Sequence, residues 1–310
     1  MRPPRQEAAG RLGLGETPPV VGEKMRLALA AAAVAALLCS PGSAQQSAPR
    51  GSIATQPRLQ LWRLDCGEFV IKQYGAFFSD TFQYPRGPKN IVGSCYLIRH
   101  GDRYMLWDTG LTDALIGRDF DNEAQTIRLR RSLVDQLAQL KVRPEQVETI
   151  GISHWHFDHV GQAARFPQAR LLIGKGDLDL LRADPPVDQD SVKGLAHWLT
   201  GGGKVEPVAR DHDVFGDGRV LMLKLPGHTP GHYALLVRLA SGPVLLSGDL
   251  YHFTEQVATR GVPPFNHDRA DTLASMDRFD RMAKNLKAKV IIQHEPADIA
   301  KLPAFPKAAQ

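Results

Sequence analysis

The stretch ISHWHFDHVG (residues 152–161) places three histidines and one aspartate within six positions. Residues two apart on an extended segment project to the same side, so His154 and His156 can point together. Asp158 and His159 follow after a turn and add an oxygen and a nitrogen donor. Neutral imidazole and carboxylate are the ligands that zinc prefers in hydrolytic sites, so this density of donors predicts a metal site.

Three further donors follow apolar runs elsewhere in the chain. His228 stands in LPGHTPGH, Asp249 in LLSGDLYHF and His294 in VIIQHEP. Each comes directly after a predicted strand and precedes a loop, which is where α/β sheets present functional groups. Each alone is a weak signal, but together with the histidine cluster they predict a shared site.

The pattern of apolar residues predicts a layered α/β domain. The segment 93–110 reads as a hairpin, and 148–154 reads as a short buried strand ending at the histidine cluster. Helical spacing is predicted over 124–140, through Ile127 and Leu137, and over 270–286. The remaining predicted strands are 170–176, 220–227, 233–239, 243–249 and 289–294.

The N-terminal residues predict export. From Met25 the chain has a basic residue, an apolar run over 27–38 and small residues before Gln45, the order of a secretory signal peptide. The run is shorter than the ~20 residues that span a bilayer. We therefore predict a disordered lead-in or mis-assigned start over 1–24, a signal peptide over 25–44 and a single domain over 45–310. The mature protein would be periplasmic or secreted, without a stable membrane anchor.

Charge and cysteine content narrow the class of protein further. The formal net charge of the chain is +5, and removing the leader lowers it to about +3, without a long basic run that would indicate nucleic-acid binding. Cys66 and Cys95 both lie in strand-like segments. A disulfide between them would suit an oxidising compartment, but it needs a Cα separation below ~7 Å, so we predict two buried thiols.

Together, H-x-H-x-D-H, G-H-T-P-G-H, S-G-D and a late histidine resemble the metallo-β-lactamase superfamily over about residues 58–300. The resemblance implies an αββα sandwich with a dinuclear metal site at one edge. Asp108 in LWDTG matches a position that orients a ligand histidine, although a turn-capping role fits the sequence equally well. The resemblance also implies two divalent metal ions, zinc being expected, with one held by His154, His156 and His228, the other by Asp158, His159 and His294, and Asp249 between them.

A site of this kind implies hydrolysis of a small-molecule lactone, ester or amide. Attack by a metal-bound hydroxide needs no serine or cysteine nucleophile, and the sequence contains no G-x-S-x-G motif. Asp158 is the candidate for carrying a proton from the attacking water to the leaving group. A binding protein without turnover would be expected to have lost one or more of the seven ligands.

The motifs are most similar to the N-acyl homoserine lactonase branch, whose members open the lactone ring of quorum-sensing signals. An exported metallo-β-lactamase is the alternative, but β-lactamases generally lack a bridging carboxylate at the position of Asp249. A thioester hydrolase of the glyoxalase II type shares the seven ligands but is normally not exported. The resemblance therefore favours quorum quenching by lactone hydrolysis.

Two segments bear on substrate recognition. The aromatic segment 72–92 is either a loop packed on the core or a flap beside an apolar substrate pocket. Lactonases of this family carry a tyrosine three residues after the bridging aspartate, whereas here that position is His252 and Tyr251 comes one residue early. Both are candidate catalytic residues. Adjacent residues on an extended segment face opposite sides, so we expect His252 to donate a hydrogen bond to the substrate and Tyr251→Phe to change little.

Overall fold

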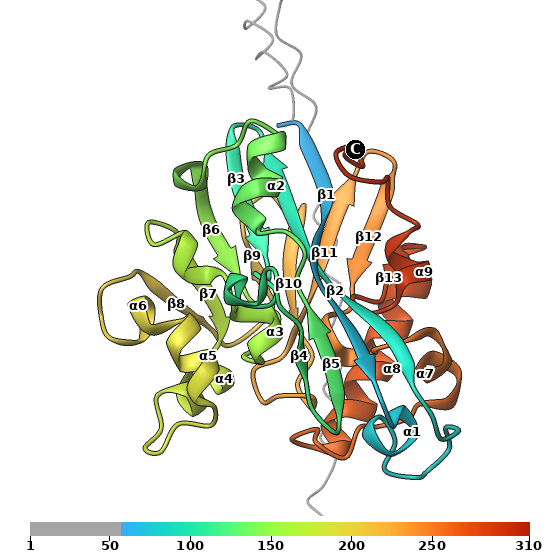
Figure 1. Cartoon of the computed structure of the whole chain (residues 1–310). Coiled ribbons are helices and arrows are strands. Elements are labelled where there is room, and N and C mark those ends of the chain that lie inside the picture. Colours follow the sequence, from blue (N-terminus) through green and yellow to red (C-terminus); the bar gives the residue numbers. More distant parts are fainter. Residues whose placement is uncertain (1–56) are drawn as a thin grey trace, which may run out of the picture. The chain divides into compact units, whose positions relative to one another are not determined.

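Apolar runs separated by glycine and proline form two β-sheets in the computed structural model, which describes residues 57–310 (Figure 1). The predicted lead-in and signal peptide lie outside the described residues. Within 57–310, no helix combines the length and apolar character needed to cross a bilayer.

The first sheet has eight strands in the order β4-β5-β1-β2-β3-β6-β7-β8. The long strands β1 and β2 pair antiparallel, as do β2 and β3, which form the predicted hairpin. From β3 onward the pairing through β6, β7 and β8 is parallel. The strands are β1 (Leu59–Ile71), β2 (Lys89–His100), β3 (Arg103–Trp107), β4 (Phe120–Asp121), β5 (Gln125–Arg128), β6 (Val147–Gly151), β7 (Arg170–Gly174) and β8 (Val205–Val208).

The second sheet has five strands in the order β13-β12-β11-β10-β9. Its central strand β11 is YALLVRL, and six of its seven residues are buried, as expected for a strand covered on both faces. The strands are β9 (His212–Asp213), β10 (Val220–Lys224), β11 (Tyr233–Leu239), β12 (Gly242–Leu246) and β13 (Lys289–Ile291).

Three apolar cores define four layers. Trp107 and Leu172 of the first sheet pack on Met222 and Leu235 of the second, which places the two sheets face to face. Helices cover the outer face of the first sheet around Trp198. The 18-residue helix α8 covers the outer face of the second through Met276 and Phe279. The helices are α1 (Tyr74–Phe77), α2 (Leu133–Gln139), α3 (Phe157–Val160), α4 (Lys175–Leu181), α5 (Gln189–Gly194), α6 (Ala196–Leu199), α7 (Thr254–Thr259), α8 (Arg269–Leu286) and α9 (Pro296–Ile299). The predicted αββα architecture is confirmed.

The predicted helix over 124–140 is wrong in its first half. Residues 125–128 form β5, in which Ile127 pairs with Phe69 of β1, and the helix α2 begins only at Leu133. Ser132 caps that helix by accepting a hydrogen bond from the backbone N–H of Asp135. Ile127 has helical spacing by coincidence, since its side chain is buried in an apolar cluster with Phe69 and Leu129.

Cys66 and Cys95 form a disulfide, so the prediction of two buried thiols is wrong. Leu64 lies opposite Cys95 on the paired strands β1 and β2, and the register shifts between Asp65 and Gly67. The two cysteine Cα atoms are 5.8 Å apart, within the distance that a disulfide spans.

Candidate metal centre

The sheets present the predicted donors where strands end. Residues 152–156 continue from β6, and the short helix α3 carries Asp158 and His159. His228 lies between β10 and β11, Asp249 lies just after β12, and His294 follows β13. Segments far apart in the sequence therefore meet at one edge of the sandwich.

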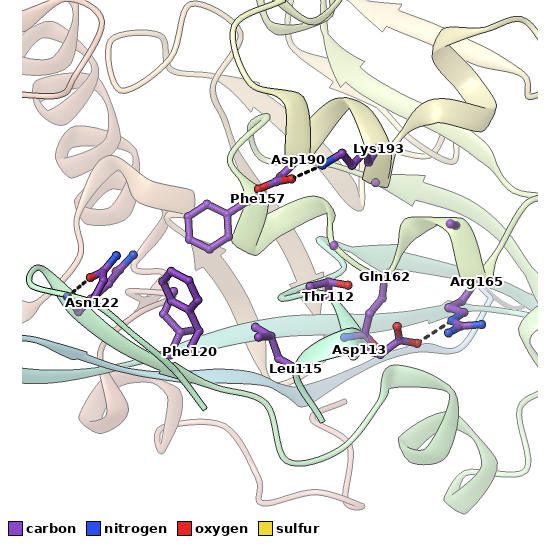
Figure 2. A pocket seen from close by; sticks show the side chains of 15 residues that line it. Thr112, Asp113, Leu115, Phe120, Asn122, Phe157, Gln162, Arg165, Asp190 and Lys193 are labelled. Atoms are coloured by element: carbon purple, nitrogen blue, oxygen red, sulfur yellow. Dashed lines mark hydrogen bonds and ion pairs between the residues drawn. The ribbon is translucent and has the colours of Figure 1, made fainter. Parts of the chain in front are cut away.

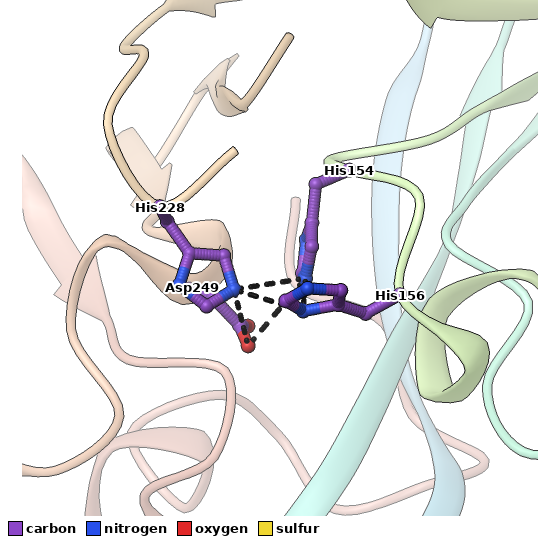
Figure 3. Close-up of side chains that lie close together, drawn as sticks. All are labelled: His154, His156, His228 and Asp249. Atoms are coloured by element: carbon purple, nitrogen blue, oxygen red, sulfur yellow. Dashed lines mark hydrogen bonds and ion pairs between the residues drawn. The ribbon is translucent and has the colours of Figure 1, made fainter. Parts of the chain in front are cut away.

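Three imidazoles form the first donor group together with Asp249 (Figure 3). His154 Nε2 is 2.9 Å from His156 Nδ1 and 3.2 Å from His228 Nε2. His156 Nδ1 and His228 Nε2 are 3.0 Å apart. Nitrogens bound to a tetrahedral metal with bonds of about 2.0–2.1 Å would lie roughly 3.3 Å apart. The three ring nitrogens therefore have nearly the spacing that one tetrahedral ion requires.

Asp158, His159 and His294 form the second donor group. Asp249 lies between the groups. Its Oδ1 is 3.2 Å from His159 Nε2 and 3.0 Å from His294 Nε2, whereas its Oδ2 is 3.6 Å from His228 Nε2. One carboxylate thus presents one oxygen to each group, the geometry that a bridging ligand needs.

Partnerless buried atoms show that the pocket fits divalent metal ions. His159 Nε2 and Asp249 Oδ1 are buried, and neither makes a hydrogen bond within the described part of the chain. Buried polar atoms are otherwise paired in nearly all proteins. Both atoms point at other donors, and a cation between them would satisfy each one.

The first group favours neutral rings. Burial lowers the pKa of His154 and His228 well below the ordinary value, and it lowers the pKa of His156 to about 4. The cause is the loss of hydration of an imidazolium. These rings therefore keep free lone pairs at neutral pH, the state in which imidazole binds a metal.

The second group has the opposite electrostatics. Burial acts against protonation of His159, but the carboxylates of Asp249 and Asp158 outweigh it and raise the pKa of His159 well above its ordinary value. The pKa of His294 is raised by the same carboxylates. Burial would raise the pKa of Asp249, but the positive rings of His294 and His159 hold it well below its ordinary value. The carboxylates thus attract positive charge here, which a bound cation would supply.

Buried contacts orient the donor rings. Asp108 Oδ2 accepts a hydrogen bond from His159 Nδ1 at 3.0 Å, so Asp108 is the orienting residue that the resemblance implied. His294 Nδ1 donates to Val92 O at 2.7 Å. His232 Nδ1 donates to Leu225 O, and its Nε2 accepts from the backbone N–H of Asp249. Asp108 adopts a left-handed φ of +59°, an uncommon conformation that its buried contacts sustain.

Asp177 of α4 is a residue that the sequence reasoning missed. Its buried carboxylate accepts hydrogen bonds from the backbone N–H of Trp155 at 3.0 Å, from Thr229 Oγ1 at 2.8 Å and from the backbone N–H of Gly231 at 2.6 Å. Trp155 lies between two donor histidines, and Thr229 follows a third. Asp177 therefore joins the two loops of the first group. Nothing in GKGDLDLL distinguishes it from a helix-start aspartate.

A cavity of about 190 Å³ opens onto both donor groups. Its lining includes Asp158, Asp249 and His294, together with Phe77 and Phe78 of the predicted flap. Phe82, in contrast, is 83% exposed. The flap segment therefore places two of its aromatic rings beside the donors.

The two catalytic candidates after Asp249 face different ways. His252 lines the cavity, with its Nε2 3.3 Å from Asp249 Oδ2 and its ring 4.7 Å from that of Phe78. Tyr251 is fully buried in the core beneath α8, and its hydroxyl donates to the carboxylate of Asp280. Tyr251 therefore does not line the cavity, and of the two catalytic candidates only His252 borders it. Its side chain points to the opposite side from that of His252.

Figure 2 shows residues that line a second, larger cavity, whose volume is about 620 Å³. Gln125 and Phe157 line both cavities. Leu115 and Phe120 add apolar walls, and the Asp190–Lys193 ion pair lies toward solvent. An elongated small molecule could occupy both spaces past Phe157.

Sequence comparison gives the class of protein. The Metallo-beta-lactamase superfamily model matches residues 89–294, and the chain belongs to this superfamily. Within it, the chain is similar to the N-acyl homoserine lactonase AttM of Rhizobium radiobacter. The two are 31% identical over 182 residues, which cover 56% of this chain and 68% of that protein.

Solved structures share the fold. An N-acyl homoserine lactone hydrolase, with its product N-hexanoyl-L-homoserine bound at the catalytic metal centre, has a TM-score of 0.69 and 20% identity. The match covers 82% of this chain and 100% of that chain. AidC, a dizinc quorum-quenching lactonase, has a TM-score of 0.56 and 17% identity over 82% of this chain and 90% of that chain. Both are lactonases built on the same sandwich.

Proposed function

We propose that this protein is a metal-dependent hydrolase that opens the lactone ring of N-acyl homoserine lactones and thereby quenches quorum sensing. The observation that carries the proposal is the pair of donor groups that share Asp249 and open onto an aromatic cavity. The similarity to the lactonase AttM supports the choice of a lactone over a β-lactam or a thioester.

We propose two zinc ions as the resident metals, held by the seven donors predicted from the sequence. Imidazole and carboxylate donors suit zinc, and AidC of the same fold is a dizinc enzyme. Such a metal pair would lower the pKa of a bound water toward about 7 and polarise the lactone carbonyl. Asp249 would bridge the pair because its two oxygens face different groups.

Asp158 is the proposed proton carrier. Its side chain lines the cavity and is 13% exposed, and its Oδ2 lies 3.7 Å from His159 Nε2 and 3.8 Å from His294 Nε2. A carboxylate that reaches the cavity can take a proton from the attacking water. It can then return the proton to the ring oxygen of the opened lactone.

His252 is the proposed hydrogen-bond donor to the substrate, in the place where related lactonases carry a tyrosine. Its ring lies between Phe78 and the donor groups, and its plane is nearly parallel to that of His294 at 5.7 Å. An N–H held there would stabilise negative charge on the lactone oxygens.

The aromatic walls would bind the acyl chain. Phe77 and Phe78 border the smaller cavity, and Phe157 leads into the larger one. Burial of apolar surface stabilises binding by roughly 0.8 kcal/mol per CH₂, so the two cavities together favour long acyl chains over short ones.

We also propose export to the periplasm or medium. The predicted signal peptide and the Cys66–Cys95 disulfide support it, because disulfides persist in oxidising compartments. Cell fractionation against a periplasmic marker enzyme tests it. Retention in the cytoplasm with the leader uncleaved would contradict it.

The function is tested by one panel of substrates on purified, zinc-loaded protein. The panel contains hexanoyl and dodecanoyl homoserine lactones, a cephalosporin and a glutathione thioester. We expect kcat/KM for the lactones to exceed that for the other two by roughly a hundredfold, as expected for a site selective for one carbonyl geometry. Faster turnover of the cephalosporin than of the lactones would identify the protein as a β-lactamase. Faster cleavage of the thioester would identify it as a hydrolase of the glyoxalase II type.

A further inference from the structure

Gln293 is a fully buried residue between the last strand and His294. Its Oε1 accepts hydrogen bonds from Trp107 Nε1 at 2.9 Å and from the backbone N–H of Gly248 at 3.1 Å. Its Nε2 donates to Asp108 Oδ2 at 2.9 Å and to the backbone carbonyl of Ser94 at 3.4 Å. One amide thus connects its own segment to three others, at Ser94, at Trp107 and Asp108, and at Gly248.

The orientation of this amide follows from its neighbours. An indole N–H and a backbone N–H can only donate, so the amide oxygen must face Trp107 and Gly248. The NH₂ group must then face Asp108. The contact with Asp108 is therefore a donation to a carboxylate oxygen.

This donation helps to fix how His159 faces the centre. Asp108 Oδ1 accepts from the backbone N–H of Ser153 at 2.6 Å, and Oδ2 accepts from both Gln293 and His159 Nδ1. A carboxylate that only accepts requires the proton of His159 to be on Nδ1. In the neutral ring that binds a metal, Nε2 then has the lone pair, and this is the atom 3.2 Å from Asp249 Oδ1.

The other arm of Gln293 acts on Asp249 itself. Gly248 precedes Asp249 and has a φ of +55°. A Cβ on Gly248 would come within 2.5 Å of His232 Nε2, so the turn is both tight and closely packed. By holding the N–H of Gly248, Gln293 supports the turn that presents Asp249. The backbone of Gln293 leads directly into His294.

We propose that Gln293 is a positioning residue for the second donor group, Asp158, His159 and His294 with Asp249. It acts through Asp108 on His159 and through Gly248 on Asp249, and it sets the affinity of that group for a divalent metal. The group around His154, His156 and His228 depends instead on Asp177. The proposal rests on the divalent-metal site of the proposed function and does not depend on the substrate.

The variant that tests the contact between Gln293 and Asp108 most directly is Gln293→Glu. It retains the shape of the side chain and an acceptor for Trp107 and Gly248, but it places an oxygen where the NH₂ group faced Asp108. Loss of such an orienting contact lowers metal affinity by roughly 10–100-fold. Zn²⁺ and Co²⁺ affinities of the metal-free protein are measured by chelator competition, and the visible absorption of Co²⁺ reports the donor geometry.

Variants that retain only one intact donor group show which of the two metal sites Gln293→Glu weakens. In His228→Ala, which retains the second group, Gln293→Glu should weaken the remaining Zn²⁺ site by at least about tenfold. In His294→Ala, which retains the first group, it should change the affinity by less than about threefold. Equal effects in the two backgrounds, or no effect in His228→Ala, would overturn the proposal. Failure of the wild-type protein to bind two metals would instead defeat the proposed function.

Gln136→Glu is the matched control. Gln136 is also buried, with its Oε1 accepting from the backbone N–H of Asp65 and its Nε2 donating to the Asp65 carbonyl, both at 2.8 Å. It joins α2 to β1, so this variant should lower the melting temperature without changing either metal affinity. If it reproduces the loss, the effect of Gln293→Glu is one of general stability. Where Gln293→Glu does not fold, Gln293→Met, which removes both the donor to Asp108 and the acceptor for Gly248, must still weaken the second donor group more than the first.

Discussion

Reduction of the Cys66–Cys95 disulfide should lower the free energy of unfolding by roughly 3.6 kcal/mol. The two cysteines are 29 positions apart in the sequence. Closing a loop of that length removes about 12 cal/mol/K of entropy from the unfolded chain, which corresponds to roughly 3.6 kcal/mol at 25 °C. A folded region of about 250 residues has an unfolding entropy near 530 cal/mol/K, so the melting temperature should fall by about 7 °C.

The assay is calorimetry of the zinc-loaded protein with and without a phosphine reductant. Thiol titration must show two additional free thiols after reduction. The double variant Cys66→Ala/Cys95→Ala is the control, since the reductant should leave its melting temperature unchanged. A wild-type melting temperature that moves by less than about 1 °C, with both thiols titratable, would refute the loop-entropy reasoning.

Four further outcomes are expected. Asp249→Ala should lose at least one metal and most activity, and full occupancy of both sites by metal analysis would rule out a bridging role. His252→Ala should lower kcat by about 10²-fold with both metals retained, as expected for the loss of one preorganised hydrogen-bond donor. Tyr251→Phe should change kcat little, because the Tyr251 hydroxyl contacts Asp280. A larger loss of kcat in Tyr251→Phe than in His252→Ala would mean that Tyr251 reaches the substrate. The double variant Phe77→Ala/Phe78→Ala should raise KM more for dodecanoyl than for hexanoyl homoserine lactone, and equal increases would remove these rings from the acyl-chain site. Burial raises the pKa of Asp177 to about 7, so its contribution to stability is fully present below the ordinary pKa near 4 and is lost as the pH rises through about 7. The free energy of unfolding of the wild type, measured with denaturant, should therefore decline over this pH range, whereas that of Asp177→Asn should not. The same decline in both proteins would assign it to another group.

The seven predicted donors meet in the structure because each one follows a predicted strand. The spacing of His154 and His156 and the apolar runs before Asp249 and His294 are local signals, and they are sufficient to predict a shared edge. The strand and helix patterns predicted a layered α/β domain, and the resemblance carried by the histidine and aspartate motifs implied its αββα arrangement.

Other features depend on contacts that no local pattern reports. Ile127 belongs to a strand because β1 offers it a partner, which overrides its helical spacing. The disulfide depends on the register between two strands and on a shift beside Gly67. Asp177 and Gln293 act through hydrogen bonds to residues 22–54 and 45–199 positions away, respectively, so nothing in their own segments marks them.

Part of the walls of the two cavities comes from connections between strands that carry none of the seven donors. Phe77 and Phe78 belong to the connection between β1 and β2, and Phe120 and Gln125 belong to the β4–β5 hairpin. Exposed connections tolerate changes of length and sequence far better than the strands they join. Evolution can therefore lengthen, shorten or replace these connections and alter which molecules enter, while the hydrolytic chemistry is inherited unchanged from the strand ends. New substrate ranges, including useful engineered ones, should arise by exchange of these two connections.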